Sequence, residues 1–130
     1  MILLYAHFMR RNKKVMRLLM HRLKENKKLN IDNTKIGYIG IITKLEEEFR
    51  EVAYSIVKYS RDRTLKNLIE VIAETFDLIQ VCILILWRSH RESVKFDKSN
   101  LVQEVNISHK DKLVERQWII ETGIEIDVKE

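Results

Sequence analysis

Two pairs of carboxylates with the same spacing are the residues of this 130-residue chain that are best placed to do chemistry. Glu48 and Glu51 form the first pair, and Glu74 and Asp77 form the second. Because three residues make almost one turn of an α-helix, the two members of each pair lie on the same side of their helix. Two facing helices would then bring all four carboxylates to one point. Such a group repels itself and loses its hydration, so the spacing indicates a cation site.

The surroundings of the second pair favour a site over a solvated helix face. On a helix, Glu70, Glu74 and Asp77 would fall within about 60° of one another. Leu, Ile, Val and Phe lie on nearly every side of that helix. Glu48 lies at the edge of the apolar stripe of the preceding helix, and Glu51 lies farther out. For the acidic run that contains this first pair, a surface location remains the alternative.

The ligand atoms in this pattern are all carboxylate oxygens. Oxygen ligands select Mg²⁺, with Mn²⁺ as a substitute, rather than zinc. None of the four histidines stands three residues after a glutamate, which argues against a di-iron bundle with Glu-x-x-His ligands.

The elements that must position these acids are helices. The chain has no proline, only three glycines, and one third of its residues are charged. This composition favours an all-α fold over a sheet with many tight turns. We expect a single domain over residues 1–130, with a core at about 10–118 and a C-terminal tail at 119–130. The apolar periodicity predicts four helices, from within residues 2–9 to about 28, at about 34–59, at about 64–90 and at about 99–117.

Two of the predicted helices indicate how the chain assembles. The second has an apolar stripe with alternating spacings of four and three residues, which suits a helix bundle. The third is apolar on nearly every side, and one small chain can hardly enclose such a helix. We therefore expect a four-helix bundle completed by oligomerisation, as a homodimer or a homotetramer.

Charge and cysteine content bound the location and the partners. The single cysteine, Cys82, excludes an intramolecular disulfide and fits a reducing compartment. The longest apolar run, 76–87, is too short to span a bilayer, so we expect a cytoplasmic protein without a membrane partner. Basic residues are concentrated in the first third of the chain. A solvated helix face explains them without nucleic acid, because no nucleic-acid-binding motif accompanies them.

Three short stretches resemble one known family. The run Lys-Leu-Glu-Glu-Glu-Phe-Arg-Glu at 44–51 is similar to the K-L-x-E-E-x-x-E signature of MazG-like nucleotide pyrophosphohydrolases. The segment 73–78 looks like the E-x-x-D segment that follows it, and 112–118 is similar to a basic K-x-x-x-R-x-W stretch. The resemblance covers about residues 15–118. Two positions depart from it, since Ala73 stands where the family usually has an acid and Phe76 where it has a small residue.

The resemblance implies an all-α enzyme that hydrolyses a nucleoside triphosphate between its α- and β-phosphates, giving a monophosphate and pyrophosphate. Its metal ligands for Mg²⁺ would be the four acids of the two pairs. Glu47 would orient or deprotonate the attacking water, with a solvent-exposed acid as the alternative. Lys112 and Arg116 would bind phosphate oxygens, with an ordinary basic helix end as the alternative. Lys44 would pair with the phosphates or with the acids. Trp118 is a candidate for stacking on the nucleobase, with core packing as the alternative.

A second hypothesis comes from a different class of protein. The chain would be a non-catalytic helical module that uses its basic first helix to bind nucleic acid or a protein partner. Binding would then depend on Arg10, Arg11, Lys13 and Lys14 and would ignore the four acids.

Overall fold

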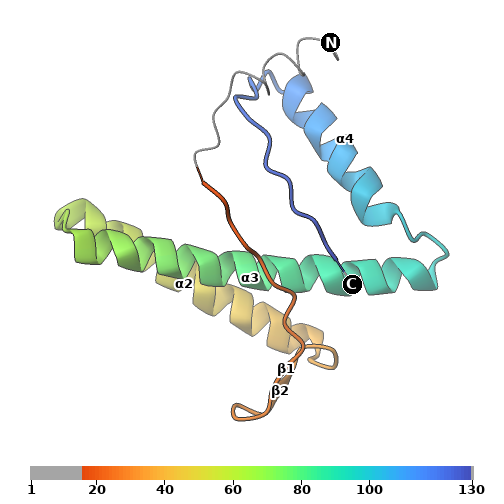
Figure 1. Cartoon of the computed structure of the whole chain (residues 1–130), viewed down its shortest axis with the longest axis horizontal. Helices are drawn as coiled ribbons and strands as arrows, with labels where there is room; N and C mark the ends of the chain where they lie inside the picture. The colour runs from red at the N-terminus through yellow and green to blue at the C-terminus, as the bar shows by residue number, and fades with distance from the viewer. Residues whose placement is uncertain (1–15, 130) are drawn as a thin grey trace.

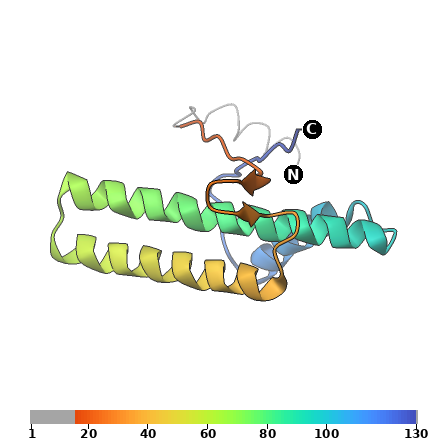
Figure 2. The ribbon, with the colours of Figure 1, turned by 90° about the horizontal axis from the view of Figure 1, so that it is seen from below.

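An antiparallel pair of long helices dominates the computed structural model, which describes residues 16–129 (Figure 1). Helix α2 covers Tyr38–Arg61 and helix α3 covers Leu65–Lys95. The two helices lie side by side along their length, as Figure 2 also shows. A third helix, α4, covers Leu101–Glu115 and diverges from the end of α3. Within the described residues the fold is therefore mostly α.

The predicted second, third and fourth helices are confirmed, with small changes in their bounds. Helix α3 runs five residues farther than the predicted end at 90, so the predicted connection 91–98 is wrong over 91–95. The helix ends where Asp97 adopts a left-handed φ of 59° and the Lys98 N–H donates to the Ser93 carbonyl. This is a Schellman ending, and here an aspartate takes the position that glycine usually holds. Helix α4 ends in the same way, with Gln117 at a φ of 69°.

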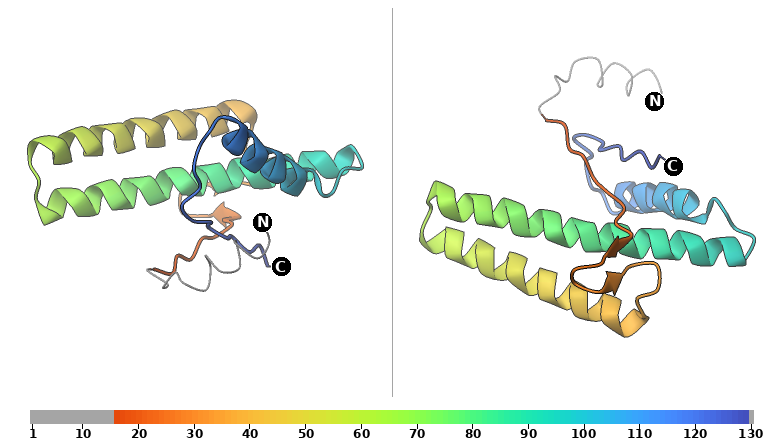
Figure 3. Two further views of the ribbon diagram at one scale, coloured as in Figure 1. Left: turned by 90° about the horizontal axis from the view of Figure 1, so that it is seen from above. Right: turned by 60° about the horizontal axis from the view of Figure 1, so that its bottom comes forward.

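The predicted first helix is wrong over residues 16–28, and its earlier part lies outside the described residues. Residues 16–24 have no regular structure, and a small antiparallel hairpin follows, made of β1 (Glu25–Asn26) and β2 (Ile31–Asp32) (Figure 3). The Asn26 side chain accepts a hydrogen bond from the Leu29 N–H, and Asn30 adopts a φ of 54°. Asparagine favours turns for both reasons, and these local bonds outweigh the helical periodicity of the leucines.

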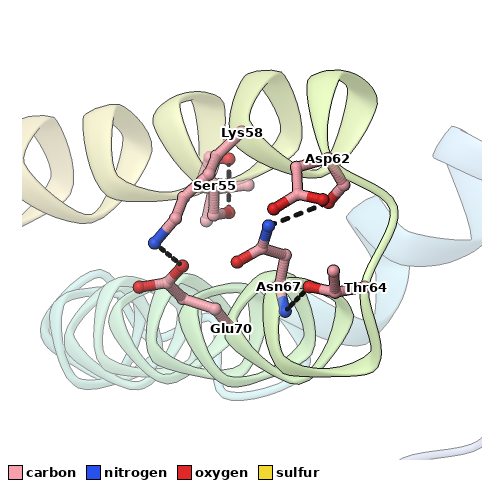
Figure 4. A network of polar contacts seen from close by, with 7 residues as sticks. Ser55, Lys58, Asp62, Thr64, Asn67 and Glu70 are labelled. Atoms are coloured by element: carbon pink, nitrogen blue, oxygen red, sulfur yellow. Dashed lines mark hydrogen bonds and ion pairs between the residues drawn. The ribbon is translucent and has the colours of Figure 1, made fainter.

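Polar contacts fix the turn between α2 and α3 (Figure 4). The Thr64 side chain caps α3 by accepting a hydrogen bond from the Asn67 N–H at 3.2 Å. The Asn67 side chain, 4% exposed, donates to the Asp62 carbonyl at 2.8 Å. Farther along, the Lys58 ammonium meets the Glu70 carboxylate at 2.9 Å across the two helices. These contacts set the register in which α2 and α3 face each other.

The apolar side of each long helix is largely exposed in the single chain. Among the described residues, the buried apolar side chains are Ile41 and Val81. Leu65 is 73% exposed and Ile69 is 56% exposed, both on the side of α3 roughly opposite Glu70 and Glu74. The predicted apolar stripe of α2 is only partly covered, since Phe49 on that stripe is 64% exposed whereas Leu45 and Val52 are half-buried.

The remaining parts of the described chain are simple. Residues 118–129 after α4 have no regular structure. None of the described helices combines the length and the apolar character that a bilayer crossing needs.

The turn between α2 and α3 gives a stability prediction. We expect Asn67→Ala to lower the free energy of unfolding by about 1–1.5 kcal/mol, because it removes the buried hydrogen bond to the Asp62 carbonyl, which then keeps only the bond from the Thr64 N–H. Asn100→Ala is the matched control, since Asn100 caps α4 without a side-chain hydrogen bond and its loss should cost less than about 0.5 kcal/mol. Urea denaturation measures both, and equal effects would contradict the role given to Asn67.

Candidate metal centre and adjoining pocket

The register of the helix pair brings acids of both helices together. Glu48 of α2 and Glu74 and Asp77 of α3 each offer one carboxylate oxygen, and these oxygens lie within 4.8 Å of one another. Glu48 and Asp77 are equally far in sequence from the middle of the turn, as are Glu51 and Glu74. An antiparallel helix pair with a tight turn places such positions opposite each other. The arrangement therefore follows from the turn and from the one-turn spacing of each pair.

Glu51 is not one of these three residues, but its side chain affects the pKa values of two of them. Hydrogen bonding with the Glu51 side chain raises the pKa of Glu74, and burial and the charges of Glu51 and Asp77 add to the increase. Burial raises the pKa of Glu48, and the nearby charges of Glu51 and Asp77 raise it further. Repulsion from the neighbouring acids thus disfavours the ionised state of Glu48 and Glu74.

The donor set fits a hard divalent cation. Glu48 Oε2 and Glu74 Oε2 are buried and have no hydrogen-bond partner within residues 16–129. A buried carboxylate oxygen without a partner is costly, and a bound cation removes that cost. Because the ligands are carboxylates from two helices, the site matches Mg²⁺ or Mn²⁺ better than a soft metal.

A pocket of about 150 Å³ adjoins the acids. Glu48 and Asp77 form its acidic side, and Lys44 stands one helical turn before Glu48 in the same pocket. Neighbouring positions of α2 and α3 thus place two carboxylates and the Lys44 ammonium in one pocket. Its other lining residues are Arg22, Leu23, Asn33, Gln80, Val81, Ile83 and Leu84.

Other predicted site residues lie elsewhere. Glu47 is exposed on α2 and lines neither the acidic cluster nor the pocket. Lys112 lies in the last turn of α4, Arg116 is its C-cap, and neither is among the residues that line the pocket. Trp118 is 66% exposed, so in the single chain it packs into no core. Because α4 diverges from α3, the single chain does not bring this basic segment to the acids (Figure 1).

Two further expectations about the surroundings of the acids can be compared with the structure. Glu70, which continues the line of acids on α3, is engaged in the ion pair with Lys58 and is not part of the cluster of three (Figure 4). Phe76 is 36% exposed and is not a wall of the pocket, so it leaves the space beside the acids open. Ala73 is exposed as well.

Sequence reasoning missed three polar residues of the pocket. Gln80 carried a signal, because it interrupts the longest apolar run of the chain. The sequence carried no indication for Arg22 or Asn33, since Arg22 was assigned to a helix that is wrong over residues 16–28 and Asn33 to a loop.

No protein-family profile, curated protein or solved structure matches this chain. The chain is therefore described by its own features, as a small, mostly helical protein with a group of acids suited to a metal ion.

The raised pKa values predict how stability depends on pH without metal. The fold favours the protonated forms of Glu48 and Glu74, so these two groups contribute most to the free energy of unfolding below the ordinary glutamate pKa. That contribution is lost as the pH rises from the ordinary glutamate pKa through the raised pKa values of the folded protein. We expect Glu48→Gln to raise the melting temperature in EDTA at neutral pH and to flatten this dependence.

Thermal melts in EDTA between about pH 4 and pH 8 measure this effect. Glu47→Gln removes the neighbouring exposed acid and should leave the melting curve unchanged. A lower melting temperature for Glu48→Gln than for Glu47→Gln at neutral pH would contradict the repulsion described above.

Proposed function

We propose that this protein is an Mg²⁺-dependent nucleotide pyrophosphohydrolase, which hydrolyses a (d)NTP between the α- and β-phosphates to a (d)NMP and pyrophosphate. The observation that carries the proposal is the meeting of Glu48, Glu74 and Asp77 within 4.8 Å, with two buried oxygens unpartnered. The pocket beside them contains Lys44, a cation suited to phosphate. The similarity of the motifs to MazG-like enzymes supplies the reaction type.

The four acids have the role of metal ligands in this proposal. Glu48, Glu51, Glu74 and Asp77 would hold Mg²⁺, for which Mn²⁺ substitutes. The bound ion would neutralise phosphate charge and acidify a water molecule. Lys44, which lines the pocket, would bind a phosphate oxygen. The resemblance gives Glu47 the role of base, and its carboxylate is exposed on α2.

The basic segment at the end of α4 has its proposed role in an assembly. Lys112, Arg116 and Trp118 would contact the phosphates and the base of a substrate held by another copy of the chain. These residues do not line the pocket of their own chain, because α4 diverges from α3, so a second copy would have to bring them to the substrate.

We also propose that the protein is a homodimer or homotetramer that completes a four-helix bundle. The support is the exposed apolar side of α3 and the exposed stripe of α2. An uncovered surface of this kind is unfavourable in water and is covered when a second helix pair packs on it. Such an enzyme would act on cytoplasmic nucleotides. Nothing in residues 16–129 favours the alternative of a nucleic-acid-binding first helix, because residues 16–28 are not helical.

Pyrophosphate release tests the enzymatic proposal. We expect the purified protein to release pyrophosphate from at least one NTP or dNTP with Mg²⁺, and EDTA to abolish the release. Glu48→Ala and Asp77→Ala should each lower the rate at least about 100-fold, because each removes a ligand of the metal that the reaction needs. Glu46→Gln is the matched control, as Glu46 is an exposed acid on α2 that pairs with Arg50. An inert protein across a full nucleotide panel with Mg²⁺ and Mn²⁺ would falsify the proposal.

Sedimentation velocity tests the proposed assembly. We expect the wild-type chain to sediment as a dimer or tetramer at micromolar concentration. The double variant Ile69→Lys/Ile72→Lys should shift it to monomer, because two charges would enter an apolar interface. Val105→Lys changes an exposed apolar residue of α4 and should leave the assembly intact. A monomeric wild-type protein would contradict the bundle.

A further inference from the structure

One wall of the pocket comes from residues 21–36, the segment that precedes α2. Arg22, Leu23 and Asn33 line the pocket, whereas its acidic side belongs to α2 and α3. Three side chains of α3 hold this segment by its backbone. Gln80 donates to the His21 carbonyl, Arg88 donates to the carbonyls of Asn33 and Ile36 at 3.2 and 2.7 Å, and Arg91 donates to Thr34 at 3.1 Å. The wall is therefore attached to the helix that carries Glu74 and Asp77 (Figure 2).

The Arg22 guanidinium is oriented but not neutralised. Its central carbon lies 3.6 Å from the centre of the Trp87 ring, which holds the group by cation–π stacking. Stacking uses the face of the guanidinium and leaves the N–H groups along its edge available. Within residues 16–129, no hydrogen bond or ion pair engages those groups, although Glu48 and Asp77 line the same pocket. The planar guanidinium of Arg22, with several N–H donors available beside the acidic cluster, is suited to bind a phosphate group.

The Asn33 amide is held in one orientation with its oxygen free. Its Nδ2 donates to the Leu23 carbonyl at 3.3 Å, so the nitrogen is engaged inside the wall. Its Oδ1 is buried and has no hydrogen-bond partner within residues 16–129. A buried acceptor in a pocket wall requires a donor. The N–H groups of a nucleobase and the hydroxyl groups of a sugar are such donors, whereas a phosphate oxygen is not.

We propose that this segment recognises the substrate, with Arg22 binding a phosphate and Asn33 Oδ1 accepting a hydrogen bond from the nucleoside. The inference rests on the proposed function, because it takes the ligand to be a nucleoside triphosphate. It adds to the proposed function that Arg22 recognises the phosphate part of the substrate and Asn33 the nucleoside part. The volume of about 150 Å³ holds one group of a nucleotide, so the rest of the ligand extends outward past the acids.

Calorimetric titration with two ligands separates the two roles. The ligands are α,β-methylene nucleoside triphosphates, which resist cleavage between those phosphates, and tripolyphosphate, which has no nucleoside; both are used with Mg²⁺. We expect Arg22→Gln to weaken the binding of both ligands about 10- to 100-fold, as the loss of charged hydrogen bonds would. Asn33→Ala should weaken only the nucleotides, by about 10-fold, and should leave tripolyphosphate binding unchanged. Ribo- and deoxyribonucleotide pairs then show whether the donor is the 2′-hydroxyl of the sugar.

Matched variants give this experiment its controls. Arg63→Gln removes the same charge from an exposed residue of the turn between α2 and α3, and it should change neither affinity. Arg22→Lys keeps the charge but loses the stacked fork, so we expect affinities between those of wild type and Arg22→Gln. Mn²⁺ affinity, measured without phosphate ligand, should not be weakened in Arg22→Gln, because the variant removes a nearby positive charge and leaves the carboxylates in place.

The outcomes distinguish the inference from the proposed function. An Arg22→Gln variant that binds both ligands as well as Arg63→Gln does would overturn the role of Arg22. An Asn33→Ala variant with unchanged nucleotide binding would overturn the role of Asn33, whose oxygen a water molecule would then satisfy. A wild-type protein that releases no pyrophosphate but binds both ligands, with the expected losses in the variants, would sink the enzymatic proposal and leave recognition by this wall standing.

Discussion

The antiparallel register of α2 and α3 is the constraint on which the rest of the structure depends. Thr64 and Asn67 fix the turn, and the contact between Lys58 and Glu70 fixes the pairing of the helices beyond it. Acids at equal distances in sequence from the turn then lie opposite each other. The interface between the helices therefore contains Glu48 and Glu74, whose raised pKa values disfavour ionisation. Chemistry that requires converging carboxylates thus weakens the fold that produces it, unless a cation offsets the repulsion.

This polar interface explains why the apolar residues lie outside. The sides of α2 and α3 that face each other carry acids, Ser55 and Asn67, so they cannot supply much hydrophobic stabilisation. Much of the apolar surface of the two helices faces away, with Leu65 and Ile69 among the exposed side chains of α3. Within one chain, the small apolar contact around Ile41 and Val81 is supplemented by hydrogen bonds and an ion pair at one end of the helix pair. Burial of the stripes between copies is the interaction most able to stabilise such a helix pair.

Local features of the sequence were sufficient to predict the helices and the acidic cluster, but not the pocket. One-turn spacing and apolar periodicity are properties of a helix itself, so the bounds of α2 and α3 and the pairing of Glu48 with Asp77 follow from them. The hairpin depends on the turn chemistry of Asn26 and Asn30, which competes with the leucine periodicity. The place of Arg22 depends on Trp87, far along the chain, and no local pattern encodes that contact. The direction of α4 depends on the left-handed backbone of Asp97.

The charges in the pocket indicate what kind of ligand satisfies the whole site. Arg22 and the acids line one small cavity, yet the stacking on Trp87 holds the guanidinium without an ion pair to Glu48 or Asp77. A cation alone would satisfy the acids and leave Arg22 and Lys44 without partners, and a phosphate alone would be repelled by the acids. In the proposed function, a divalent cation bound to a polyphosphate would satisfy both sets at once, with its metal toward the carboxylates and its oxygens toward the cations. Separate sets of opposite charge within one pocket thus support the proposal of a metal–polyphosphate ligand over either component alone.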